Sequence, residues 1–344
     1  MFQWLNRQMD KLGSPTLDWV QIEVTTCCNG SCIYCPHTVL KNGWTSRHMP
    51  LELFHELVPF LRHTDLVYLQ GWGEPLLNRD LFEMVRICKT RGKRVGFTTN
   101  GMLLTEETIR ILVDLGLDIL GISLAGTTAG THDRIRKGTD LNQVVSHLER
   151  LREIKAEKKI PQPAVHLAYL MLRSNFHELD GVLALARRVG AEQVVASNLT
   201  LIVDPELSAE AIFNDTERTD HYRNALETIK VTAASEGIVF DYHGPGLDDT
   251  FFGCRENVHH ACVISVDGEV VPCVLCDPVL GRDRETHAGI SFGNVRDESL
   301  TRIWNKKEYR GFRDLFDPEI TRRPEQIQSR MPPCCTNCYK KLGA

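Results

Sequence analysis

The feature that most constrains this chain is a regular alternation of strand-like and helix-like segments between residues 20 and 200. Short runs rich in β-branched and aromatic residues predict strands over VQIEV (20–24), LVYLQ (66–70), RVGFTT (94–99), ILGISL (119–124), VHLAYLML (165–172) and QVVASNL (193–199). Apolar residues at helical spacing predict helices over 50–63, 79–92, 104–116, 140–158 and 176–190, with another over 215–236. Six consecutive βα units indicate an α/β fold with a parallel sheet, either doubly wound or closed as a barrel.

The pattern changes after about residue 240. Turn residues fill HGPGLDD (243–249), and VISVDGEVV (263–271) alternates around Asp-Gly, which is typical of a β-hairpin. A short helix is expected over 299–316. We therefore predict an N-terminal extension over 1–17, a first domain over 18–240 and a smaller α+β domain over 241–344.

Composition narrows the classes of function. Forty Lys and Arg residues stand against 45 Asp and Glu, a formal net charge of −5, which disfavours a nucleic-acid-binding protein. No stretch approaches the ~20 apolar residues of a membrane span. The N-terminal segment has no apolar run of signal-peptide length. We expect a soluble, cytoplasmic protein without a membrane or nucleic-acid partner.

Twelve cysteines form the next constraint, and eleven of them fall into two sets. Without a secretory signal, such clusters indicate metal ligands or redox groups rather than disulfides. The first set is Cys27, Cys28, Cys32 and Cys35; the second is Cys254, Cys262, Cys273, Cys276, Cys334, Cys335 and Cys338. Cys88 stands apart, and its apolar surroundings predict a buried helix residue.

The first set follows directly on the first predicted strand. The carboxyl ends of parallel strands are where such folds build their sites. Cys28-x3-Cys32-x2-Cys35 offers three thiolates, which would leave one iron of a [4Fe–4S] cluster open. A zinc site with His37 as the fourth ligand is the alternative, and reduced cysteines without a role are another.

This loop resembles the one that radical S-adenosylmethionine (radical SAM) enzymes use to hold a cluster whose open iron chelates SAM. Tyr34 matches the aromatic position that packs near the adenine in that family, and Cys27 falls outside the spacing. The resemblance extends over about residues 18–200. It implies the family's partial (β/α)6 barrel for the first domain.

Further segments carry the same resemblance in the same order. QGWGEPLL (70–77) looks like the family's GGEP motif, with Gly71, Gly73, Glu74 and Pro75 in register and Trp72 in place of a glycine. In the family this motif holds the methionyl amine of SAM, and a carboxylate suits an ammonium group. A glycine-rich turn with a solvated acid is the plain alternative. TTNGMLL (98–104) and GISLAGTTAGTHDRIRKG (121–138) also match, which implies SAM contacts for Asn100, Ser123 and either Arg134 or Arg136.

The second cysteine set resembles the SPASM and shorter twitch domains that follow many radical SAM barrels. The resemblance implies an auxiliary [4Fe–4S] cluster on Cys254, Cys273, Cys335 and Cys338, with Cys276 and Cys334 as alternative ligands. The segment GNVRDESLTRIWNKKEYR (293–310) matches the connecting helix. A structural zinc ribbon is the alternative, and Cys262 has no assigned role.

The resemblance implies an oxidoreductase-type enzyme in which a reduced cluster cleaves SAM to a 5′-deoxyadenosyl radical, which abstracts a substrate hydrogen. The auxiliary cluster would assist an oxidative outcome, and a flavodoxin or ferredoxin would donate electrons. The catalytic acid or base is unknown; Asp241, Tyr242 and His243 are the candidates, because they end the run GIVFDY (237–242) near the domain junction.

Three functions remain open for such a chain. Its SPASM-type relatives favour a maturase of a peptide, a protein or a metalloenzyme. A barrel that begins by about residue 18 leaves no room for an N-terminal leader-binding module. The alternatives are a small-molecule dehydrogenase, epimerase or decarboxylase acting on a sugar, aminocyclitol or nucleoside, and a non-enzymatic iron–sulfur electron carrier. The GWGEP segment argues against the carrier.

Overall fold

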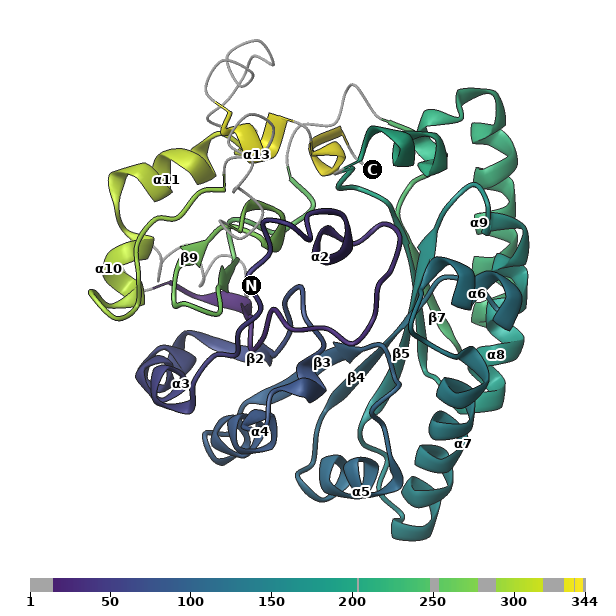
Figure 1. The fold of residues 1–344 in the computed structure, drawn as a ribbon, viewed down its shortest axis with the longest axis horizontal. Helices are drawn as coiled ribbons and strands as arrows, with labels where there is room; N and C mark the ends of the chain where they lie inside the picture. Colours follow the sequence, from purple (N-terminus) through teal and green to yellow (C-terminus); the bar gives the residue numbers. More distant parts are fainter. Residues whose placement is uncertain are drawn as a thin grey trace. The chain divides into compact units, whose positions relative to one another are not determined.

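The computed structural model describes residues 15–202, 204–247, 254–277, 289–317, 331–336 and 338–342 (Figure 1). Residues 1–14 of the predicted N-terminal extension lie outside this range. Contacts divide the chain into two compact units. Among the described residues, the first unit takes those within 15–27, 42–95 and 254–342, and the second takes those within 28–41 and 96–247.

The first unit is built on strands from both ends of the chain. Its elements are β1 (Leu17–Ile22), α3 (Leu51–Leu57), η1 (Val58–His63), β2 (Thr64–Tyr68), η2 (Pro75–Leu77), α4 (Leu81–Thr90), β8 (Ala261–Ile264), β9 (Val270–Val271), η7 (Val274–Cys276), α10 (Leu300–Trp304), α11 (Lys307–Asp314), α13 (Pro333–Thr336) and η9 (Tyr339–Leu342). β1 pairs in parallel with β2 on one side and with β8 on the other. The hairpin predicted around Asp-Gly is confirmed, because β8 and β9 pair antiparallel.

The parallel pairing of β8 with β1 was not expected from the sequence. Trp19 lies opposite Ala261 and Ile22 opposite Ile264, so the C-terminal segment extends the sheet that β1 begins. All four residues of β8 are buried. An apolar run predicts a strand but not the strand with which it pairs. This pairing joins residues more than 230 positions apart, so no local pattern could have predicted it.

The second unit contains the remaining strands in chain order. Its elements are α2 (Pro36–Val39), β3 (Arg94–Thr99, from Gly96 onward), α5 (Glu106–Asp114), β4 (Ile119–Leu124), α6 (Ala129–Ile135), α7 (Leu141–Lys158), β5 (Ala164–Met171), η3 (Phe176–Gly181), α8 (Val182–Val189), β6 (Gln193–Asn198), η4 (Pro205–Glu210), η5 (Ile212–Asn214), η6 (Thr216–Arg218), α9 (Thr219–Ser235) and β7 (Val239–Tyr242). Each strand from β3 to β7 pairs in parallel with the next.

Helices α7, α8 and α9 lie along one face of strands β4 to β7 (Figure 1). The buried residues of α7 recur at helical spacing: Leu141, Val144, Val145, Leu148, Leu151 and Ile154. This apolar stripe packs on the sheet while the charged face meets solvent. The α/β fold class with parallel strands is therefore confirmed. Strands β3 to β7 point the same way, so the residues that end them, such as Asn100 after β3 and Ser123 in β4, share one edge.

The prediction of one helix over 299–316 is wrong in one respect, because the structure forms two helices there. α10 ends at Trp304, and α11 begins at Lys307. Lys306 takes an extended conformation with φ −57° and ψ 144°. The side chain of Arg313 donates to the freed carbonyl of Trp304 at 2.8 Å and lies 3.9 Å from the centre of its ring. A tertiary contact thus satisfies the interrupted helix end.

Candidate functional site

The turn after β2 carries the GWGEP segment and is bonded to the residues that follow β1. The amide of Gly73 donates to the carbonyl of Thr25 at 3.1 Å, and that of Glu74 donates to Cys27 at 2.8 Å. A Cβ on Gly73 would lie 2.5 Å from both of these carbonyl oxygens. Only glycine permits this approach. Glu74 is 2% exposed, and its Oε1 accepts from the amide of Leu76 at 3.3 Å, which caps η2.

Glu23 is a buried acid that the motif comparison missed. Its Oε1 accepts from the amide of Trp72 at 3.0 Å, and its Oε2 accepts from Val266 at 3.2 Å. Burial, followed by the charge of Asp277, raises its pKa well above the usual value. The signal was present in the sequence, because Glu23 is the single charged residue in the strand-like run VQIEV.

The loop with Cys28, Cys32 and Cys35 belongs to the second unit and ends where α2 begins. A Cβ on Gly30 would lie 3.7 Å from the sulfur of Cys28 and 3.8 Å from that of Cys32, so two of the three thiols border the same space. The amide of Gly30 donates to the Cys28 sulfur at 3.4 Å. Three soft sulfur donors in one short loop fit an iron–sulfur cluster with one open iron.

Arg136 places a positive charge beside these thiols. The guanidinium donates a hydrogen bond to the hydroxyl of Tyr34. Burial alone would lower the pKa of Arg136, but Tyr34 and the thiols of Cys32 and Cys35 raise it above its usual value. Burial raises the pKa of Cys35 to about 12, with the charge of Cys32 adding to it. Thiolates here need compensating positive charge, which a bound metal cluster would supply.

The other residues expected to contact SAM lie at the carboxyl ends of β3 and β4. Asn100 is 5% exposed, and its side chain donates to Asn29 of the cysteine loop at 2.7 Å and accepts from Met102 at 3.0 Å. Ser123 is half-buried in β4. Arg134 is exposed on α6, whereas Arg136 is buried. The two arginines therefore differ in surroundings although they are two residues apart.

The C-terminal cysteines are buried or half-buried and gather in the first unit. The sulfur atoms of Cys276, Cys334 and Cys335 all lie within 4.8 Å of one another, and those of Cys276 and Cys335 are 3.8 Å apart. The two alternative ligands, Cys276 and Cys334, therefore lie beside Cys335, which is one of the four expected ligands. Hydrogen bonds from Cys276 and Cys335 lower the pKa of Cys334 to about 5.

Cys273 connects this group to the other expected ligands. It hydrogen-bonds Cys276, and its charge raises the pKa values of Cys254 and Cys338 after the larger effect of burial. The pKa of Cys338 reaches about 12. These six cysteines are buried or half-buried and offer the soft sulfur ligands that an iron–sulfur cluster needs.

The three candidates for acid or base lie at the end of β7. Asp241 is exposed and accepts from the side-chain amide of Gln193 at 2.7 Å. The hydroxyl of Tyr242 donates to Glu227, and burial followed by that bond raises its pKa to about 12. The amide of Asn198 donates to Nδ1 of His243 at 3.5 Å.

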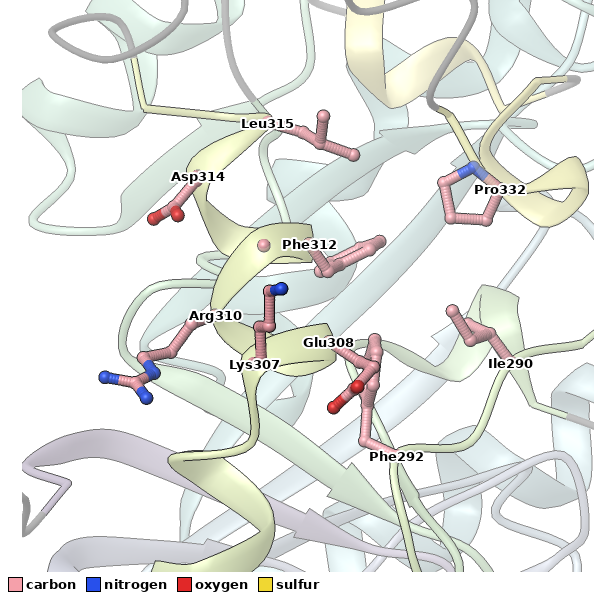
Figure 2. A pocket seen from close by; sticks show the side chains of 10 residues that line it. Ile290, Phe292, Lys307, Glu308, Arg310, Phe312, Asp314, Leu315 and Pro332 are labelled. Carbon is pink, nitrogen blue, oxygen red and sulfur yellow. The ribbon is translucent and has the colours of Figure 1, made fainter.

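A pocket of about 740 Å³ lies along α11 in the first unit (Figure 2). The rings of Phe292 and Phe312 face it, and Lys307, Arg310 and Asp314 lie at its border (Figure 2). None of the cysteines and none of the expected SAM-binding residues lines it. Two of its lining residues are bonded to the C-terminal cysteines: the amide of Ile290 donates to the carbonyl of Cys276 at 2.9 Å, and the amide of Cys335 donates to the carbonyl of Pro332 at 2.9 Å.

Two family models match the chain. The model of the Radical SAM superfamily matches residues 22–186, and that of the SPASM iron–sulfur cluster-binding domain matches residues 254–339. The second match covers Cys254 through Cys338 and favours an iron–sulfur cluster over a zinc ribbon. No helix in the described part of the chain has both the length and the apolar character needed to cross a membrane.

Several curated proteins are similar over most of their length. A tungsten-containing aldehyde ferredoxin oxidoreductase cofactor-modifying protein of Pyrococcus furiosus is 26% identical, over 94% of this chain and 87% of the relative. An AdoMet-dependent heme synthase of Methanosarcina barkeri is 27% identical, over 86% and 84%. A PqqA peptide cyclase of Bradyrhizobium diazoefficiens is 24% identical, over 87% and 77%.

Solved structures share the fold at low identity. SuiB of Streptococcus suis bound to S-adenosylmethionine superposes with a TM-score of 0.67 at 14% identity, over 90% of this chain and 71% of that one. Native anSMEcpe with bound AdoMet and the Cp18Cys peptide gives 0.63 at 17%, over 94% and 89%.

Proposed function

Because the chain belongs to the radical SAM superfamily and ends in a SPASM iron–sulfur domain, we propose that it is a maturase that modifies a peptide, a protein or a metalloenzyme by radical chemistry. Its cofactors are SAM, the [4Fe–4S] cluster that binds SAM and an auxiliary [4Fe–4S] cluster. When bound and reduced, the first cluster supplies the electron that cleaves SAM to methionine and a 5′-deoxyadenosyl radical, which abstracts a substrate hydrogen.

The chain's own residues bind and orient these groups. Cys28, Cys32 and Cys35 hold the first cluster in this proposal: they follow one another in one short loop, and the sulfurs of Cys28 and Cys32 border the same space at Gly30. Glu74 is a buried acid fixed by the close backbone pairing of its motif, which suits an acceptor for the methionyl ammonium of SAM. The remaining SAM contacts in this proposal are Tyr34, Gly71, Gly73, Pro75, Asn100, Ser123, Arg134 and Arg136.

The auxiliary cluster is proposed on Cys254, Cys273, Cys335 and Cys338, with Cys276 and Cys334 as alternatives. It would assist an oxidative step, which needs an electron acceptor inside the protein. The domain boundary at 240/241 stays a prediction. We place the reaction in the cytoplasm, with a flavodoxin or ferredoxin as electron donor. His243, at the carboxyl end of β7, is proposed with Asp241 and Tyr242 as a candidate acid or base.

The observation that carries the maturase assignment is the similarity, over 94% of this chain, to a protein described as cofactor-modifying for an oxidoreductase. A small-molecule reaction is the second candidate, because a heme synthase is similar at 27% identity.

The test begins with anaerobic reconstitution, followed by incubation with dithionite and SAM while 5′-deoxyadenosine is measured. We expect formation of 5′-deoxyadenosine by the wild-type chain and none by Cys32→Ala. Full iron loading without 5′-deoxyadenosine would instead support an electron carrier.

The substrate class is then tested with fractions of a cell extract. A maturase predicts that the macromolecular fraction accelerates 5′-deoxyadenosine formation and that protease treatment removes this effect. Acceleration by the small-molecule fraction alone would support the second candidate.

A further inference from the structure

Residues 135–138, at the end of α6, run beside the loop that carries Cys28, Cys32 and Cys35. The amide of Ser31 donates to the carbonyl of Lys137 at 2.6 Å, and that of Ile33 donates to Ile135 at 3.0 Å. Gly138 has φ +86°, and a Cβ there would lie 3.1 Å from the carbonyl oxygen of Asn29. Backbone contacts at three successive points therefore fix this segment against the cysteine loop.

Arg136 is the residue between the two carbonyls that accept these bonds. Its side chain is folded toward the loop and is 8% exposed. The guanidinium donates to the hydroxyl of Tyr34, which lies in sequence between Cys32 and Cys35. Its Nε is buried and has no hydrogen-bond partner among the described residues. After burial, the groups that act most strongly on its pKa are Tyr34 and the three thiols of the loop.

These contacts give Arg136 partners within the cysteine loop itself, in addition to the SAM contact proposed for it. The guanidinium already donates to Tyr34, and the thiols of Cys32, Cys35 and Cys28 interact electrostatically with it. A buried cation is screened less by solvent than an exposed one, so it acts more strongly on neighbouring charge. The reduction potential of an iron–sulfur cluster depends on nearby charge, hydrogen bonds and exposure to solvent.

We propose that Arg136 tunes the reduction potential of the SAM-binding cluster. Its buried cation is fixed by Tyr34 and by the backbone of residues 135–137. It offsets the charge of the three thiolates and thereby raises the reduction potential of the cluster. This inference rests on the proposed function, since it requires a cluster at Cys28, Cys32 and Cys35. Reduction adds one electron to the cluster, and a fixed positive charge stabilises the more negative, reduced form.

The experiment is a redox titration of the reconstituted full-length chain without SAM, followed by electron paramagnetic resonance. The signal that Cys32→Ala abolishes identifies the SAM-binding cluster. SAM is absent, so a contact between Arg136 and its carboxylate cannot contribute. The variants are Arg136→Met and Arg136→Gln, which remove the charge, and Arg136→Lys, which keeps it. Lys137→Met is the matched control, because it removes an exposed positive charge from the same segment.

We expect the midpoint potential of this signal to shift to more negative values in Arg136→Met and Arg136→Gln. It should stay near the wild-type value in Arg136→Lys and Lys137→Met. Wild-type potentials in both neutral variants would overturn the inference. An equal shift in Arg136→Lys would also overturn it, because the role would then be shape rather than charge.

Arg136→Gln keeps the inference testable if Arg136→Met fails to hold iron, since glutamine can still donate to Tyr34. Absence of any signal that depends on Cys32 in the wild-type chain would overturn the proposed function as well. A normal wild-type signal with unshifted variants overturns this inference alone.

Discussion

Gly71 and Glu23 are packed so closely that a Cβ on Gly71 would lie 2.1 Å from Cγ of Glu23. Glu23 is fully buried at the end of β1 and accepts hydrogen bonds from Trp72 and Val266. A single buried carboxyl group thus joins the GWGEP turn to the segment after β8. The conformation of the motif depends on an acid that lies outside it.

Substitution of Gly71 by alanine should therefore destabilise the protein. The added Cβ would also lie 2.4 Å from Oε1 of Glu23, the atom that accepts from Trp72, so Glu23 must move and lose that bond. We expect a loss on the order of 1–3 kcal/mol in the free energy of unfolding, measured by urea denaturation. Gly130→Ala is the control, because nothing lies within 4 Å of a Cβ at this position in α6. An equal effect in both variants would contradict this account.

Iron content should report the ligands of the auxiliary cluster. Two [4Fe–4S] clusters give about eight irons per chain, and Cys254→Ala should retain about four. Cys88→Ala should retain all of them, since Cys88 is a fully buried residue of α4. Anaerobic reconstitution with an iron assay measures this. If Cys254→Ala keeps the wild-type iron content while Cys276→Ala loses iron, the auxiliary cluster is instead held by the group formed by Cys276, Cys334 and Cys335.

Asn175 should contribute strongly to stability at the carboxyl ends of the strands in the second unit. Its side chain is fully buried, accepts from Leu172 at 2.7 Å, and donates to Ala125 at 3.1 Å and to Leu170 at 2.8 Å. Asn175→Ala leaves these backbone groups unpaired, so we expect a loss on the order of 3 kcal/mol in unfolding free energy. Asn214→Ala is the matched control.

Asn214 is exposed, and its two bonds to Ser208 can be replaced by water. Its substitution should change stability by less than about 0.5 kcal/mol. If Asn175→Ala and Asn214→Ala lose similar amounts of unfolding free energy, the buried hydrogen bonds of Asn175 stabilise the protein no more than exposed ones. Denaturation midpoints and slopes of both variants measured side by side decide this.

His132 should make stability depend on pH. Burial, with Arg136 adding to it, lowers its pKa from 6.5 to about 3, and its Nδ1 accepts from the amide of Ala125 at 3.3 Å. Between these two pKa values only the unfolded chain binds the proton, so stability falls as the pH falls from 6.5 toward 3. The slope contributed is at most about 1.4 kcal/mol per pH unit.

The unfolding free energy of His132→Gln should consequently fall less steeply than that of the wild type between pH 6 and pH 4. His177→Gln is the matched control for the loss of a histidine, because the side chain of His177 is 70% exposed whereas that of His132 is buried. Parallel pH profiles for the wild type and His132→Gln would exclude a depressed pKa.

Local pattern was enough to predict most elements of the chain. The strands over 94–99 and 119–124 match β3 and β4 at both ends, because a β-branched run bounded by turn residues carries its own boundaries. The helix expected over 176–190 begins as η3 and becomes α8 only at Val182. Over a single turn, a 3₁₀-helix and an α-helix both bring residues i and i+3 to one side, so apolar spacing does not separate them.

The sequence by itself determined the order of βα units, the cysteine loop after the first strand and the residues that resemble the radical SAM motifs. These depend on spacing along the chain. Only the tertiary structure decided that Arg136 binds Tyr34, that Glu23 lies under Gly71, that β8 pairs with β1, and that Cys276 and Cys334 meet Cys335. Such contacts join residues far apart in sequence, and they arise from how packed elements place side chains, which no local pattern encodes.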